Sequence, residues 1–348
     1  MGQQTVLGFI KEGQDKGKPI FSRNGGMTLR NATGVNTQSF GYQRAIDTLT
    51  YIKTQITEQK FYRVNIADYM PVVVGEGSFS QDILTNQTLS TSGDFEEGNI
   101  NQGSNNAQLA TADVAVTSQT VQVINWAKSI SYTLIEIEQA LQSNNWDLIA
   151  SKHNARKENW DLGLQQIAML GSLNNNAGVP GLLNQPNVTV NTSLIQQLIN
   201  SMTVTQFTSL VAGVVENYRS NSNRTSYPTH WVIPEDDYNG MTVPYSSAFP
   251  VISQIKYLTD SFAALGMPGL KIMPSAYAIP ANNTAWGINK HVYMLYNYDP
   301  RSIRMDVPVM ITSTQPNTLN NFQFQDAAYG QYTGLWSYRI LEMYQYQF

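Results

Sequence analysis

Residues 71–131 constrain the fold of this chain more than any other segment. A run of valines after Pro71 predicts one strand, and valines that alternate with mainly polar residues over 114–123 predict a second strand with one apolar face. Residues 90–108 between them are rich in Gly, Asn and Ser, so we predict one long two-stranded hairpin with a flexible, acidic tip. Because an isolated two-stranded ribbon is only marginally stable in water, this hairpin is expected to pack against a partner surface.

Charge is distributed unevenly along the chain. Residues 1–63 carry nine Lys/Arg and four Asp/Glu, whereas residues 64–127 carry seven acids and no Lys or Arg. Two interpretations fit: two solvated surfaces, which charge runs usually are, or complementary charges that guide one copy of the chain onto another. Charged residues make up only 13% of the chain, against roughly 25% in ordinary soluble domains. A surface of neutral polar groups costs little to cover, so this composition suits a protein buried among copies of itself.

Two helices are predicted after the hairpin. Thr133-Leu134-Ile135-Glu136 matches a capping box and starts a short helix that reaches about Gln142. A second helix is predicted from about Trp146 to Leu170, where Gly171 is well placed to end it. An Asn/Gly/Pro-rich turn, residues 174–186, comes next. For the rest of the chain we predict helices at 204–220 and 250–265, and strands at 230–233, 271–278, 291–298 and within 307–348.

This order of elements resembles the major capsid protein fold of tailed bacteriophages, the Hong-Kong-ninety-seven-type fold that encapsulins share. The most specific piece is the long helix followed by Gly181-Leu182-Leu183-Asn184, a turn similar to the one that encapsulins and several phage capsid proteins carry there. The resemblance covers most of the chain and implies an α+β fold. It implies an N-terminal arm (1–70), an E-loop hairpin (71–131), a spine helix and P-domain (132–190), an A-domain (191–306) and P-domain return strands (307–348).

The resemblance implies a structural protein and not an enzyme. Copies of the chain are expected to self-assemble into an icosahedral shell of pentamers and hexamers that encloses the double-stranded DNA genome of a tailed phage. Further partners would be a portal, a separate scaffolding protein, since the arm is too short to hold a fused one, and in some capsids decoration proteins. Contact with DNA is expected to be weak, because only the N-terminal residues are basic. The expected location is the virion capsid, after assembly in the host cytoplasm and without a membrane.

In this family the E-loop lies across an adjacent subunit. We therefore expect the acidic E-loop tip to meet basic groups of a neighbour, with the arm as the candidate partner. Some family members also join an E-loop lysine covalently to a neighbour's asparagine, but this chain has no lysine between Lys60 and Lys128, so no such crosslink is expected from the E-loop. The candidate contact residues are Asp94, Glu96 and Glu97 at the tip and Lys11, Lys16, Lys18, Arg23 and Arg30 in the arm.

Few residues suggest chemistry. The chain has no cysteine and three histidines, His153, His230 and His291, without an HExxH pattern or a Cys/His cluster, so neither a metal nor another cofactor is expected. The acidic run 235–237 is interpreted as a solvated turn and helix start. Two alternatives stay open: an encapsulin-like nanocompartment shell, and a glycan-binding or hydrolytic protein, which the 19 tyrosines allow.

Overall fold

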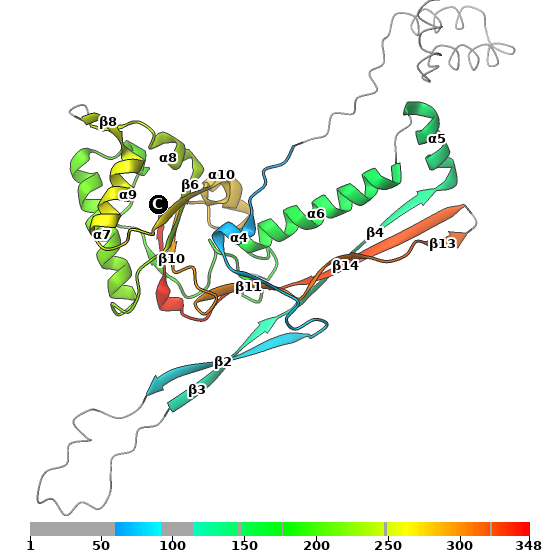
Figure 1. Cartoon of the computed structure of the whole chain (residues 1–348), viewed down its shortest axis with the longest axis horizontal. Helices are drawn as coiled ribbons and strands as arrows, with labels where there is room; N and C mark the ends of the chain where they lie inside the picture. Colours follow the sequence, from blue (N-terminus) through cyan, green and yellow to red (C-terminus); the bar gives the residue numbers. More distant parts are fainter. Residues whose placement is uncertain (1–59, 92–113, 145–147, 176, 247–248, 321) are drawn as a thin grey trace, which may run out of the picture. The chain divides into compact units, whose positions relative to one another are not determined.

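The computed structural model describes residues 60–91, 114–144, 148–175, 177–246, 249–320 and 322–348 (Figure 1). The chain divides into two compact units, Met1–Phe61 and Tyr62–Phe348, and nearly all the described residues belong to the second. That second unit mixes helices with several sheets, as an α+β fold does. Among the described residues, no helix combines the length and the apolar character that crossing a membrane requires.

A five-stranded sheet, called the central sheet below, lies between the two main hydrophobic clusters of the second unit. In two of its three inner strands, β6 (His230–Pro234) and β10 (Val292–Tyr296), all five residues are buried, so these strands are covered on both faces. Side chains on one face, such as Trp231 and Tyr293, pack against helices α7 (Val204–Asn221) and α9 (Gln254–Ala264). The strand order is β5 (Thr189–Asn191), β16 (Met343–Gln347), β10 (Val292–Tyr296), β6 (His230–Pro234) and β9 (Lys271–Ser275).

The opposite face of this sheet packs against the end of α6 (Leu148–Leu170) and the turn that follows. Gly171 ends the helix with a φ of 80°, which favours glycine. The amides of Leu182 and Leu183 then donate to the carbonyls of Ala168 and Met169 at 2.8 Å, which fastens the turn to the last turn of the helix. The Gly-Leu-Leu-Asn sequence therefore joins α6 to the central sheet through two fully buried leucines.

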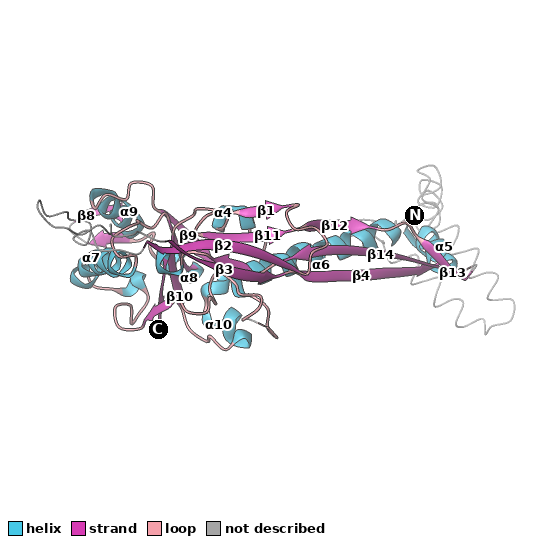
Figure 2. Ribbon diagram, turned by 90° about the horizontal axis from the view of Figure 1, so that it is seen from below, coloured by secondary structure: helices cyan, strands magenta, loops and turns pink. Residues whose placement is uncertain are grey.

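A second, elongated sheet lies beneath α6. Strand β4 (Ile124–Thr133) pairs antiparallel with β14 (Gln323–Tyr332) over the whole length of both strands. Figure 2 shows β4 as the outer strand of this sheet, with β14 next to it. The other edge of β14 pairs with β12 (Val309–Ser313) and β13 (Asn317–Asn320).

The predicted hairpin is present as β2 (Asp82–Thr91) and β3 (Val114–Gln122), which pair antiparallel. Strand β3 leads into β4 across Val123 alone, so the hairpin continues from the end of the elongated sheet (Figure 1). The expectation that the valines after Pro71 form part of this hairpin is wrong. Strand β1 (Val72–Val74) instead pairs in parallel with β11 (Ile303–Val307), because Gly75 and Gly77 turn the chain at positive φ before β2 begins.

The predicted helices are confirmed with small shifts. Thr133 and Glu136 form both bonds of the capping box that starts α5 (Leu134–Asn144). The predicted helix 250–265 begins later than expected, because its first residues form β8 (Phe249–Ser253), and Ser253 caps α9. The remaining described elements are short: α4 (Ile66–Tyr69), α8 (Glu235–Gly240), α10 (Pro280–Asn283), β7 (Pro244–Ser246), β15 (Leu335–Ser337) and four single-turn 3-10 helices at 199–201, 276–278, 284–286 and 340–342.

Candidate assembly surface

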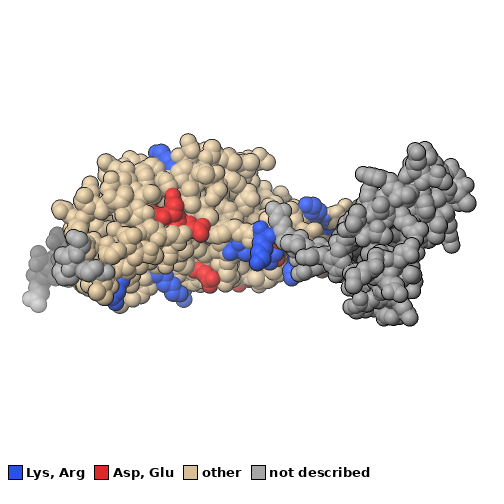
Figure 3. All heavy atoms as spheres, turned by 90° about the horizontal axis from the view of Figure 1, so that it is seen from above, with Lys and Arg blue, Asp and Glu red and all other residues tan. Residues whose placement is uncertain are grey.

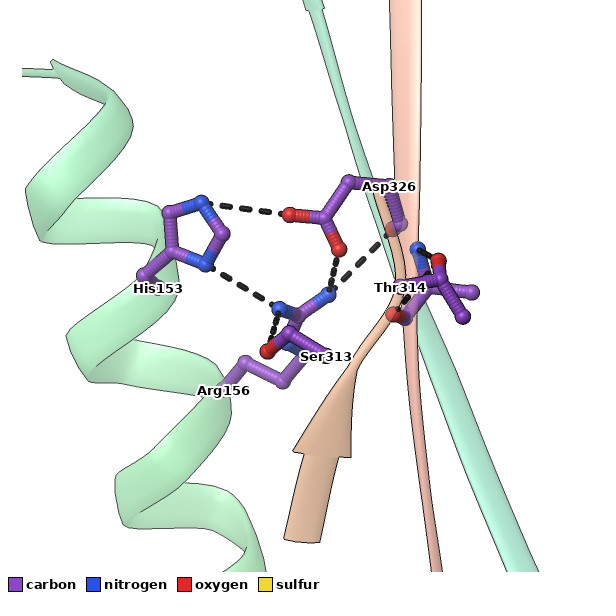
Figure 4. Close-up of polar contacts among 6 residues, drawn as sticks. His153, Arg156, Ser313, Thr314 and Asp326 are labelled. Atoms are coloured by element: carbon purple, nitrogen blue, oxygen red, sulfur yellow. Dashed lines mark hydrogen bonds and ion pairs between the residues drawn. The ribbon is translucent and has the colours of Figure 1, made fainter. Parts of the chain in front are cut away.

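A buried ion pair joins α6 to the elongated sheet (Figure 4). Nη1 of Arg156 lies 2.7 Å from Oδ1 of Asp326 on β14, and the two side chains are 2% and 1% exposed. Arg156 also donates to the backbone carbonyl of Asp326 at 3.2 Å and to Oγ of Ser313 at 2.9 Å. A buried charge pair is tolerated only when its remaining hydrogen-bonding groups are satisfied, and this one meets that condition. It therefore fixes α6 on two strands at once, β14 and β12.

His153 completes this cluster one helical turn earlier. Its Nδ1 lies 3.0 Å from Nη2 of Arg156, and its Nε2 lies 3.2 Å from Oδ2 of Asp326. His153 thus contacts both members of the ion pair and forms a second brace between helix and strand.

An aromatic layer lies further along the same interface. The ring of Trp160 on α6 contacts Trp126 on β4 edge-on, with centroids 5.0 Å apart, and Tyr332 on β14 at 6.1 Å. Gly330 lies directly beneath the indole, because a Cβ at that position would come within 2.5 Å of the ring. Beside these rings, a recess of about 200 Å³ opens between helix and sheet, and Gly163 lines it. The interface between α6 and the elongated sheet therefore holds the buried Arg156–Asp326 ion pair at one end and a partly empty recess beside Trp160 at the other.

The root of the hairpin is held by polar contacts to the sheets. Arg304 on β11 lies 3.4 Å from Glu76 in the turn before β2 and 3.2 Å from the buried Asp306. Burial raises the pKa of Asp306 above its ordinary value, and the charge of Arg304 opposes that shift. The amide of Phe79 donates to Oε1 of Gln331 on β14 at 2.7 Å. The Arg304–Glu76 ion pair and the Phe79–Gln331 hydrogen bond hold the turn before β2. Strands β2 and β3 pair with no strand but each other within the described part of the chain.

The surface around these elements carries little charge. Figure 3 shows a face on which most described atoms belong to uncharged residues, with Lys, Arg, Asp and Glu in small separate groups. The described residues contain no group of three or more His, Asp or Glu side chains that could hold a metal ion. The described residues thus combine an extended hairpin, a helix braced on a sheet and, on the face that Figure 3 shows, few charged groups.

Residues 99–341 match the sequence model of a family described as major capsid protein, which is more than half of the chain. The chain belongs to the major capsid protein family. It is therefore a structural protein of a capsid shell. A search of the curated proteins finds no match.

Solved structures show the same fold. The capsid of Myoviridae phage XM1 is similar over 86% of this chain and 96% of that chain, with a TM-score of 0.72 and 15% sequence identity. The capsid of a native GTA particle matches 86% of this chain and 95% of that chain, with a TM-score of 0.56 and 8% identity. The capsid of cyanophage P-SCSP1u matches 87% and 93%, with a TM-score of 0.53 and 10% identity. The α+β phage capsid fold expected from the sequence is confirmed.

The contact residues expected for this capsid protein cannot be placed. Both groups lie outside the described residues, so the structure does not test whether they meet. The residues concerned are Asp94, Glu96 and Glu97 at the hairpin tip and Lys11, Lys16, Lys18, Arg23 and Arg30 in the arm.

Sequence reasoning also missed a buried carboxylate in the major capsid protein. The acidic run starts α8 as predicted, but Asp237 is fully buried and not solvated. It accepts from the amides of Ile199 at 2.9 Å and Asn200 at 2.8 Å and from the hydroxyl of Tyr293 at 2.7 Å. These three donors come from two other elements, so no local pattern around Asp237 could have revealed its role.

Proposed function

We propose that this capsid protein self-assembles into a closed icosahedral shell of pentamers and hexamers around the double-stranded DNA of a tailed phage. The β2–β3 hairpin is the observation that carries the proposal. A two-stranded ribbon of nine or ten residues per strand is marginal by itself, and these strands pair only with each other within the described residues. A neighbouring subunit supplies the surface that the ribbon lacks.

We assign the parts of the subunit by the same reasoning. Residues 1–70 form the arm, 71–131 the E-loop, 132–190 the spine helix and P-domain, 191–306 the A-domain and 307–348 the P-domain return strands. The β2–β3 pair within the proposed E-loop and α6 within the proposed spine segment support this division.

We further propose that opposite charges help adjacent subunits to engage. The acidic tip residues Asp94, Glu96 and Glu97 would meet the basic arm of a neighbour. Each exposed ion pair contributes at most about 1 kcal/mol, but the contact repeats at every subunit of a shell. The candidate arm partners are Lys11, Lys16, Lys18, Arg23 and Arg30.

The remaining partners follow from the same role. A closed shell of this kind needs a portal, and a separate scaffolding protein is a further proposed partner, with decoration proteins as optional additions. The chain has a formal net charge of -4, so contact with packaged DNA is expected to be weak and sensitive to salt. We infer a purely structural, non-enzymatic role in the virion capsid, with assembly in the host cytoplasm.

Electron microscopy of the purified protein, expressed alone and with its scaffolding protein, tests the proposal. Closed particles with five-fold vertices support it, and phage DNA inside native particles identifies a viral shell. An enzyme cargo in place of DNA would instead indicate a nanocompartment. A stable monomer or small oligomer that binds a glycan column would contradict the shell function.

A further inference from the structure

Tyr245 and Tyr257 form the closest ring contact among the described residues. Their ring centroids lie 3.9 Å apart and their planes differ by 9°, so the two phenols overlap face to face. Every other aromatic pair in the described part of the chain has centroids at least 4.7 Å apart. Uncharged aromatic rings usually prefer offset or edge-on contacts, with centroids about 4.5–7 Å apart. The surrounding structure must therefore hold this pair together.

Three elements position the two rings. Tyr245 lies on β7, and Tyr257 lies in the first turn of α9. Strand β7 pairs with β8, and β8 runs without a break into α9, whose first turn is capped by Ser253. The buried ring of Phe207 on α7 contacts both phenols, with its centroid 5.7 Å from each. The stacked pair is thus built into the packing of the β7–β8 hairpin against two helices.

The hydroxyl groups align the two rings further. They are hydrogen-bonded to each other, and burial together with this bond raises the pKa of Tyr245 to about 12, so this phenol keeps its proton at neutral pH. Because the ring planes are nearly parallel and the two oxygens are neighbours, the ring carbons beside the hydroxyls also face each other. These ortho carbons are the positions through which two tyrosyl radicals join.

The pair is also suited to lose electrons. Two stacked rings share the electron hole that oxidation leaves, which makes them easier to oxidise than a single tyrosine. Both rings are partly exposed, so the protons that oxidation releases reach water. The chain has no cysteine, so no thiol of its own can reduce a tyrosyl radical once it has formed. An oxidising equivalent that enters the subunit is therefore expected to settle on these two side chains.

We propose that Tyr245 and Tyr257 are a site of covalent modification, at which a one-electron oxidant forms a dityrosine link within the subunit. Two equivalents of the oxidant accept one electron from each phenol, and the two hydroxyl protons pass to water. The two radicals then form a bond between ortho carbons. The C–H bonds at the joined carbons break, and their hydrogens restore the two O–H groups. The product has one new carbon–carbon bond and two hydrogen atoms fewer than the starting pair.

The link would tie the β7–β8 hairpin to α9. It closes the chain between residues 245 and 257 into a loop, and a crosslink stabilises a folded protein by restricting the unfolded chain. A chain without cysteine cannot obtain such a crosslink from a disulfide. Because both tyrosines belong to one subunit, the inference does not depend on the proposed shell function.

Oxidation of purified, unassembled subunits tests the proposal. The subunits are mixed with two equivalents of tris(bipyridine)ruthenium(III), a one-electron oxidant, and dityrosine is measured by its fluorescence. Trypsin cleaves after Lys256, between the two tyrosines, so the link joins peptide 225–256 to peptide 257–271. We expect mass spectrometry to find this joined pair as the main dityrosine product, lighter than the two separate peptides by two hydrogen atoms. The oxidised subunit should also unfold at a higher temperature.

Removal of single hydroxyl groups assigns the link. Tyr245→Phe and Tyr257→Phe each keep the stacked ring but remove one phenol, so we expect dityrosine fluorescence to fall to the level of unoxidised protein. Tyr62→Phe is the matched control, because Tyr62 contacts Tyr277 edge-on with centroids 5.9 Å apart. This control should leave the yield of dityrosine unchanged.

The remaining outcomes overturn the proposal. Wild-type subunits that give no dityrosine, or that give it mainly at another pair of tyrosines, would show that the stacked contact does not direct oxidation. Covalent dimers without a link between the two peptides would show the same. The peptide map of the wild-type chain does not require either variant to fold. A failure of the chain to form shells would leave this result unaffected, so the two proposals stand or fall separately.

Discussion

Arg156 on α6 and Asp326 on β14 form an ion pair 2.7 Å long, although 170 residues separate them in the chain. The helix contributes the cation and the sheet the anion, and both are withdrawn from water. His153, one helical turn before Arg156, contacts both members of the pair. The pair therefore determines how the long helix sits on the sheet.

Removing one member of this pair should destabilise the subunit strongly. Asp326→Ala leaves the guanidinium of Arg156 buried without its counter-charge, and we expect a loss of about 3–5 kcal/mol in the free energy of unfolding. The double variant Arg156→Met with Asp326→Leu should recover most of that loss. Urea unfolding of unassembled subunits measures both. Lys256→Ala, which breaks an exposed pair, is the control and should cost at most about 1 kcal/mol.

The imidazole of His230 should make stability depend on pH. It stacks on Tyr296 and Tyr298, and burial lowers its pKa to about 4, with a smaller contribution from Lys271. Between pH 6.5 and 4, His230 therefore binds a proton in the unfolded chain but not in the folded chain. Stability is present above pH 6.5 and is lost as pH falls through this window, by about 1–3 kcal/mol.

His230→Phe keeps the stacking and removes the titrating group. The difference in unfolding free energy between wild type and variant, measured from pH 7 to pH 4.5, should change in favour of the variant as pH falls. A difference that stays constant over this range would contradict the prediction.

Two glycines should respond in opposite ways to alanine. At Gly181 a Cβ would lie 2.1 Å from the backbone nitrogen of Gly171, so Gly181→Ala must displace the turn that fastens α6 to the central sheet. Gly163 lies within α6 with open space around its Cβ position, and Gly163→Ala should stabilise the unassembled subunit by about 0.5–1 kcal/mol. Thermal unfolding of the two variants checks both signs, and a destabilised Gly163→Ala would show that the recess is closed.

Reversing the charge of the hairpin tip should impair assembly. We expect Glu96→Lys with Glu97→Lys to lower particle yield and to weaken its dependence on salt, because attraction between exposed charges is screened by ions. Asp260→Lys, a reversal on α9, is the matched control and should change neither. Light scattering during assembly at low and high salt provides the measurement. Yield and salt dependence equal to wild type would eliminate the proposed contact between tip and arm.

Mature shells should dissociate into single chains under denaturing conditions. No lysine lies between Lys60 and Lys128, so the hairpin lacks the amine that a lysine–asparagine crosslink requires. Denaturing electrophoresis should show one band near 38.8 kDa. A ladder of covalent multimers would contradict this expectation.

The elements that sequence predicts well are those with local signals. The capping box at Thr133 predicts where α5 begins, and Gly171 predicts where α6 ends. The alternating valines predict β3. Val72–Val74 was assigned to the wrong partner because strand pairing depends on distant residues, in this case β11.

The candidate surface was predictable in kind but not in detail. The sequence indicated a hairpin that needs a partner, yet the pairing of β4 with β14 joins residues about 200 positions apart, and no local pattern predicts its register. The buried partners of Arg156 and Asp237 are equally non-local, because each draws its contacts from other elements.

The continuity of β3 with β4 has a mechanical consequence. A force that pulls on the hairpin along its strands acts directly on the β4–β14 ladder. This ladder runs from the pair Ile124–Tyr332 to the pair Thr133–Gln323. A force in this direction shears the two strands, so the hydrogen bonds of the ladder bear it simultaneously and do not break one after another. The subunit can thus carry tension that is applied to its hairpin into its own body without separating the strands one hydrogen bond at a time.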